Sequence, residues 1–70
     1  MENYNIQARA NRNRIIAYLQ KHGYNTPQEI CQELNLDEAE WNLAICEDDG
    51  RIKIGVRPDS YGVSVAWVQA

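Results

Sequence analysis

The side chains that most often carry catalysis or bind metals are scarce in this 70-residue chain. It has one histidine, His22, and two cysteines, Cys31 and Cys46, which are not part of a CxxC pair. A metal site built on these residues would need further ligands, and one histidine leaves little acid–base chemistry near neutral pH. We therefore expect no enzyme activity, no metal and no cofactor. The cysteines are expected as small buried apolar residues, each on one face of a helix, and His22 as a cap of helix carbonyls.

The charged residues are divided unevenly along the chain. Residues 1–23 carry a net charge of +3 and residues 51–70 a net charge of +2, whereas residues 24–50 carry −8 and contain no lysine or arginine. The acidic residues of this middle segment are Glu29, Glu33, Asp37, Glu38, Glu40, Glu47, Asp48 and Asp49. The overall charge of −3 thus conceals two basic ends that flank an acidic middle.

Apolar residues at helical spacing predict a first helix, which would carry the basic residues of the N-terminal segment. The pattern indicates a helix over about residues 7–22, with Ile15, Ile16 and Leu19 facing the core. Gly23 is expected to end the helix, because glycine enters the left-handed conformation without steric cost.

Two capping patterns predict two further helices. After an extended link at residues 24–25, the tract Thr26-Pro27-Gln28-Glu29 combines an N-cap, a proline at the first helical position and a capping-box partner, which indicates a helix over about 27–34. The tract Asp37-Glu38-Ala39-Glu40 repeats the capping box and indicates a third helix to about residue 47. Two such helices joined by a short link are typical of a helix-turn-helix.

After residue 50 the hydrophobic period changes from helical to two. Apolar residues alternate with basic ones over 51–56 and with small ones over 63–68, and turn-forming residues occupy 57–62. This pattern predicts an antiparallel hairpin whose apolar side packs on the helices and whose first strand has a basic outer face. We expect Trp67 of the second strand, like Trp41 of the third helix, to lie in the core.

This order of elements resembles the winged helix-turn-helix superfamily, and its details are similar to very small bacterial members such as the fimbrial-operon regulators. Residues 14–19 resemble their first helix, residues 26–34 their second, and residues 50–52 the start of their wing. The resemblance covers nearly the whole chain. It implies an α+β fold in which a three-helix helix-turn-helix core is followed by a C-terminal β-hairpin wing, as one domain over 1–70 with an ordered core of about 7–68.

The resemblance also implies a small DNA-binding regulator, with transcriptional control as its function. In the family the third helix enters the major groove, but here that helix is short and acidic, and carboxylates repel phosphates. We therefore expect any DNA contact at the wing and the first helix. The candidate nucleic-acid residues are Arg51, Lys53, Arg57, Tyr61, Arg9, Arg12 and Asn42. Two alternatives stay open: the wing cations can simply protect an edge strand from aggregation, and the arginines can form a solvated helix face.

A second hypothesis is a protein-interaction module that keeps the fold and has lost DNA binding. Its acidic second and third helices would dock on a basic protein, such as a DNA-binding protein or a polymerase surface. The candidate partner-binding residues are Glu38, Glu40, Glu47, Glu29 and Glu33. The segment without lysine or arginine favours this hypothesis, whereas the usual function of the fold favours the first.

The sequence also gives expectations for the cellular location and the oligomeric state of the protein. No apolar run approaches the length of a membrane span, and the first residues show no signal pattern. We therefore expect a cytoplasmic protein without membrane contact. A domain this small and acidic would bind DNA weakly alone, which favours action as a homodimer or beside a partner protein.

Overall fold

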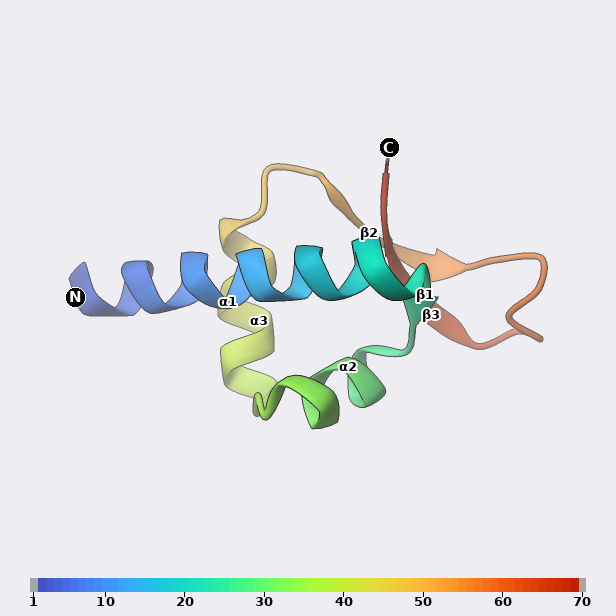
Figure 1. Cartoon of the computed structure of the whole chain (residues 1–70), viewed down its shortest axis with the longest axis horizontal. Helices are drawn as coiled ribbons and strands as arrows, with labels where there is room; N and C mark the ends of the chain where they lie inside the picture. Colours follow the sequence, from blue (N-terminus) through green and yellow to red (C-terminus); the bar gives the residue numbers. More distant parts are fainter. Residues whose placement is uncertain (1, 70) are drawn as a thin grey trace.

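The computed structural model describes residues 2–69, with side chains from residue 5 onward. Within this range the elements are α1 (Glu2–His22), β1 (Tyr24–Asn25), α2 (Pro27–Leu34), α3 (Glu38–Glu47), β2 (Ile52–Val56) and β3 (Ser64–Val68). Figure 1 shows α3 crossing α1, with α2 beneath them and the hairpin of β2 and β3 projecting past the end of α1. The predicted α+β architecture is confirmed: three helices precede a C-terminal antiparallel hairpin, an arrangement consistent with winged-helix topology.

Caps in the sequence determine where α2 and α3 begin. The Thr26 hydroxyl accepts from the Glu29 amide at 3.1 Å. Helix α3 has a complete capping box: the Asp37 carboxylate accepts from the Glu40 amide at 2.7 Å, and the Glu40 carboxylate accepts from the Asp37 amide at 2.9 Å. The predicted box of α2 is only half formed. Thr26 donates its own amide to the Asn25 side chain at 2.8 Å, so Glu29 does not reach back as expected.

The first helix is longer than predicted, since α1 begins at Glu2 rather than near residue 7. The residues before Gln7 are mostly polar and carry no apolar stripe, so periodicity does not detect them. Once a helix is nucleated, however, each added residue gains one hydrogen bond. Gly23 ends the helix as predicted, with φ at +91° and its amide donating to the Leu19 carbonyl at 2.8 Å.

A three-stranded antiparallel sheet closes one end of the helices, in the order β1-β3-β2. Residues 24–25, expected only as a link, form β1, and Tyr24 pairs with Trp67 at the centre of the sheet. On the other side of β3, Ile52 pairs with Val68 and Lys53 with Trp67. In this order β3 is the central strand, and β1 and β2 are the edge strands.

The register turns Trp67 away from the helices, so the prediction that it lies in the core is wrong. Directly paired residues share a face of the sheet, and Trp67 shares the outer face with Lys53. Ala66, fully buried, faces the helices together with Ile52, the first residue of β2. Both faces of β3 are apolar in sequence, so alternation alone could not decide which one packs inward.

The core lies between the helices and the inner face of the sheet. Trp41 is in it, as predicted, and so is the stripe of α1. Cys31 is half-buried against the core, whereas Cys46 is exposed, so the prediction of two buried cysteines is wrong for Cys46. The buried apolar residues of this cluster are Ile15, Ile16, Leu19, Ile30, Leu36, Trp41, Ala44, Ile52 and Ala66. Every element except the two-residue β1 contributes, which fixes α2 and α3 relative to the wing.

Candidate functional site

The arginines of α1 bind the C-terminal ends of the other two helices. Arg14 donates to the carbonyl of Leu34, the last residue of α2, at 2.7 Å. Arg12 donates to the carbonyl of Glu47, the last residue of α3, at 3.1 Å, and Arg9 forms an ion pair with the Glu47 carboxylate at 3.0 Å. Neither helix has a basic residue in its own last turn. The arginines therefore supply the positive charge and the donors that free helix carbonyls need.

Arg57, a predicted phosphate contact, is held against the outer face of the sheet. Its guanidinium carbon lies 5.0 Å from the centroid of the Trp67 ring and 5.4 Å from that of Tyr24, within cation–π range. Its Nε lies 3.9 Å from an Asp59 carboxylate oxygen, and the Tyr24 hydroxyl donates to the Asp59 carbonyl at 3.3 Å. This cluster ties the wing loop to the sheet.

Two wing cations are left with an accessible charge. Across residues 5–69, neither Arg51 nor Lys53 has a side-chain hydrogen bond or ion pair to another residue. Arg51 is exposed just before β2, and Lys53 is half-buried on the outer face beside Trp67. Of the predicted nucleic-acid residues with a positive charge, these two are the ones without an internal role.

The tip of the wing presents an aromatic ring in a strained backbone conformation. Tyr61 is 96% exposed and has φ at +54°, in the left-handed region that residues other than glycine, asparagine and aspartate seldom adopt. The buried Ser60 hydroxyl holds the loop by accepting from the Arg57 amide at 3.0 Å and donating to its carbonyl at 2.8 Å. Strain at an exposed site is more typical of function than of packing.

The inner side of the wing is apolar rather than basic. Ile54 and Val56 lie on the same face as buried Ile52 but extend beyond the helices, and they are 48% and 60% exposed. Val63, just before β3, is 50% exposed. The wing therefore offers apolar contact on the face that it shares with buried Ile52 and Ala66, and its cations lie elsewhere.

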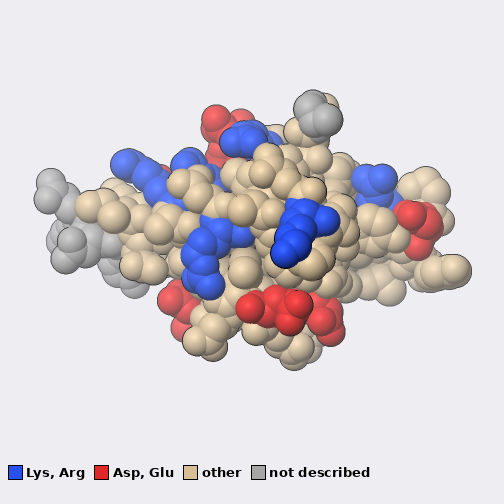
Figure 2. All heavy atoms as spheres, viewed as in Figure 1, with Lys and Arg blue, Asp and Glu red and all other residues tan. Residues whose placement is uncertain are grey.

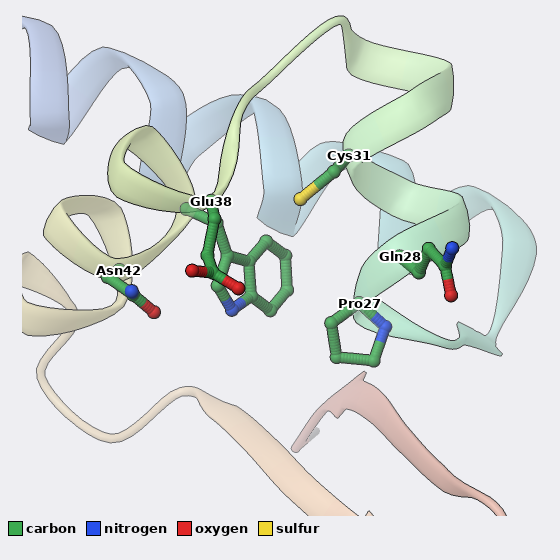
Figure 3. A pocket seen from close by; sticks show the side chains of 6 residues that line it. Pro27, Gln28, Cys31, Glu38 and Asn42 are labelled. Atoms are coloured by element: carbon green, nitrogen blue, oxygen red, sulfur yellow. The ribbon is translucent and has the colours of Figure 1, made fainter.

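A groove of about 540 Å³ opens between α2 and α3. It is lined by Pro27, Gln28 and Cys31 from α2 and by Glu38, Trp41 and Asn42 from α3. Pro27 and Gln28 precede Cys31 by four and three positions, and Trp41 and Asn42 follow Glu38 by three and four, which places each set on one side of its helix. Figure 3 shows the side chains of Cys31 and Glu38 directed into the space between the two helices, with the Pro27 ring at its margin.

The groove has a negative electrostatic potential. Burial raises the pKa of the Cys31 thiol above its ordinary value, and the nearby carboxylates of Asp37, Glu38 and Glu40 raise it further. Both effects disfavour the thiolate, so the thiol stays protonated. The same carboxylates would favour a cation in the groove and oppose a phosphate.

The predicted acidic residues divide into structural and available ones. Glu40 belongs to the capping box of α3, and Glu47 is paired with Arg9. Within residues 5–69 the carboxylates of Glu29, Glu33 and Glu38 have no hydrogen bond or ion pair. We call these three residues, together with the α2–α3 groove, the acidic face.

The charge division predicted from the sequence is visible on the surface. In the view of Figure 2, lysine and arginine side chains lie over α1, and acidic side chains gather below them over α2 and the start of α3. Two features of this arrangement were not predicted. The contacts of the arginines with α2 and α3 join residues 20 to 38 positions apart, and the groove depends on how the helices pack, which the spacing along each helix does not specify.

Comparison with known proteins adds no family to this description. The chain matches no protein-family model, no curated protein and no solved structure. Among the described residues, no helix is long and apolar enough to cross a membrane, and no cluster of three metal-ligating side chains is found.

Proposed function

We propose that this chain is a small winged-helix regulatory module that binds a basic protein partner through its acidic face. The observation that carries this proposal is the groove between α2 and α3, which is lined by a carboxylate, two amides and apolar groups. The free carboxylates of Glu29 and Glu33 add negative charge elsewhere on α2. No lysine or arginine occurs in residues 24–50 to offset that charge. Electrostatic complementarity of this kind steers a basic partner and selects it over others.

The internal roles of the arginines weaken the case for DNA. Arg9, Arg12 and Arg57 were candidates for phosphate contact, and each now has a partner within the chain. Affinity for DNA comes largely from cations placed against phosphates, and α3 offers Glu38 where winged-helix proteins usually offer a donor. Only Asn42 on that helix is an amide suited to a base edge.

The apolar inner side of the wing supports a protein partner. A stable interface commonly buries about 800 Å² on each partner, with an apolar centre and a polar rim. Ile54 and Val56 supply exposed apolar surface beside the domain core, and Tyr61 supplies an aromatic group at the tip. DNA-binding proteins and polymerases are partners whose surfaces carry the required positive charge.

A second candidate function is weak DNA binding through the wing, favoured by the free charges of Arg51 and Lys53. Wing residues in this fold contact phosphates or the minor groove. Two cations neutralise few phosphates, so such a complex would dissociate readily as salt rises. In that case the module would regulate transcription by a direct DNA contact.

Two charge-reversal variants separate these candidates. Glu29→Lys with Glu38→Lys reverses the acidic face and leaves the structural carboxylates of Glu40 and Glu47 in place, whereas Arg51→Glu with Lys53→Glu reverses the wing. The assays are affinity capture from the source cells and titration with duplex DNA, with circular dichroism to check folding. The proposal predicts that the first variant loses a protein partner that the second retains. Loss of DNA binding by the wing variant, with unchanged protein capture by both, would overturn it.

A further inference from the structure

We infer that the α2–α3 groove is a binding site for an arginine side chain of the partner, with the guanidinium held between Trp41 and the Glu38 carboxylate. This inference rests on the proposed function, because it names the group that the acidic face recognises. The volume of about 540 Å³ is within the range of small-ligand sites and leaves room for a side chain and part of its backbone.

The lining of the groove matches the chemistry of a guanidinium. The carboxylate of Glu38 can accept two parallel N–H bonds, and the amide oxygens of Gln28 and Asn42 can accept others. Trp41 is 7% exposed and is one of the residues that line the groove. Aromatic rings attract guanidinium groups through stacking and cation–π contact.

The same constellation already occurs within this chain. On the outer face of the sheet, the Arg57 guanidinium lies against the Trp67 and Tyr24 rings, with an Asp59 carboxylate oxygen 3.9 Å from its Nε. The groove contains a tryptophan and a carboxylate but no cation of its own. An arginine of the partner would place a guanidinium beside the groove's tryptophan and carboxylate, as Arg57 does on the outer face of the sheet.

Arginine fits the groove better than lysine. The acceptors come from both helices, Gln28 from α2 and Glu38 and Asn42 from α3, and a planar fork of five donors can reach acceptors in several directions. An ammonium has three donors on one atom and is more strongly hydrated. Pro27 and Cys31 contribute apolar walls, which suit the weakly hydrated guanidinium.

The test uses the whole chain, labelled with ¹⁵N, and three short Gly/Ser peptides that carry arginine, lysine or the neutral isostere citrulline at the same positions. We expect the arginine peptide to shift the indole N–H of Trp41 and the side-chain amides of Gln28 and Asn42. The indole of Trp67, on the opposite side of the sheet, is an internal control that should not move. The lysine peptide should bind more weakly and the citrulline peptide should not bind.

Glu38→Gln and Glu33→Gln form a matched pair of variants. Both remove one free carboxylate from the acidic face, but only Glu38 lines the groove. We expect Glu38→Gln to weaken the arginine peptide about twofold to fivefold, as for a partly exposed ion pair, and Glu33→Gln to weaken it less. Equal weakening by both variants, or equal binding of the arginine and lysine peptides, would overturn the arginine site while leaving a basic partner in place. Absence of any shift would also overturn it, and the capture experiment with charge-reversal variants would then decide the proposed function separately.

Discussion

Replacing Tyr61 with glycine should make the protein more stable, although it removes a large side chain. The left-handed conformation, here with φ at +54°, costs a residue with a Cβ about 1–2 kcal/mol. Glycine avoids this cost but adds about 0.4–1 kcal/mol of unfolded-state entropy. The ring is 96% exposed, so its removal forfeits almost no burial. The difference of these two terms lies between about 0 and 1.6 kcal/mol. Its midpoint is a gain of about 0.8 kcal/mol in the free energy of unfolding, or about 3–6 °C in Tm for a domain of this size.

Tyr61→Ala is the matched control, because alanine also lacks the ring but keeps the Cβ that causes the strain. We expect its stability to stay within about 0.5 kcal/mol of the original chain, with Tyr61→Gly above both in urea and thermal unfolding. If the Tyr61→Gly variant is no more stable than the Tyr61→Ala variant, the left-handed conformation is not a source of strain at this position. Should both variants weaken partner capture equally, the ring itself contributes to binding, as a strained and exposed aromatic suggests.

Three further predictions concern the contacts that hold the site. Asp48→Ala should lower the free energy of unfolding by about 1–3 kcal/mol, because one carboxylate oxygen accepts from two amides of the turn into β2, at 3.0 and 2.9 Å; unchanged urea denaturation would show that the turn forms without it. Arg14→Met should lower the free energy of unfolding by about 0.5–1.5 kcal/mol, because it removes the 2.7 Å hydrogen bond to the last carbonyl of α2. Equal stability of the variant and the original chain would show that this hydrogen bond does not stabilise α2. In a Cys46→Ser background, the pH profile of Cys31 alkylation should give a pKa above that of an ordinary thiol. Glu38→Gln should lower this pKa, since removal of a negative charge favours the thiolate, and a rise or no change would refute the negative potential assigned to the groove.

Local chemistry explains what could be predicted about the fold. Helices α2 and α3 begin where Thr26 and Asp37 cap them, and these caps depend only on residues three positions away. The change to a period of two marked the hairpin, because half-buried strands alternate. These features are local in sequence, so the order of elements followed from them.

Long-range packing explains what could not be predicted. The inward face of β3 was ambiguous because both of its faces are apolar, and the choice depends on whether Ala66 or Trp67 fits against the helices. Arg9 and Arg12 resembled a free basic patch because their partner at Glu47 is distant in sequence. The acidic segment was recognised from composition, whereas its groove arises only when α2 packs beside α3.

The most direct test of the acidic face is a titration of the ¹⁵N-labelled chain with random-sequence duplex DNA at low and at physiological salt. Our account predicts no shifts at Glu38 or Asn42 at either salt concentration. Any weak binding at low salt should be confined to Arg51 and Lys53 and should disappear at physiological salt. Micromolar binding that shifts Asn42 and neighbouring residues of α3 would contradict the account, because it would show that α3 contacts DNA despite its carboxylates.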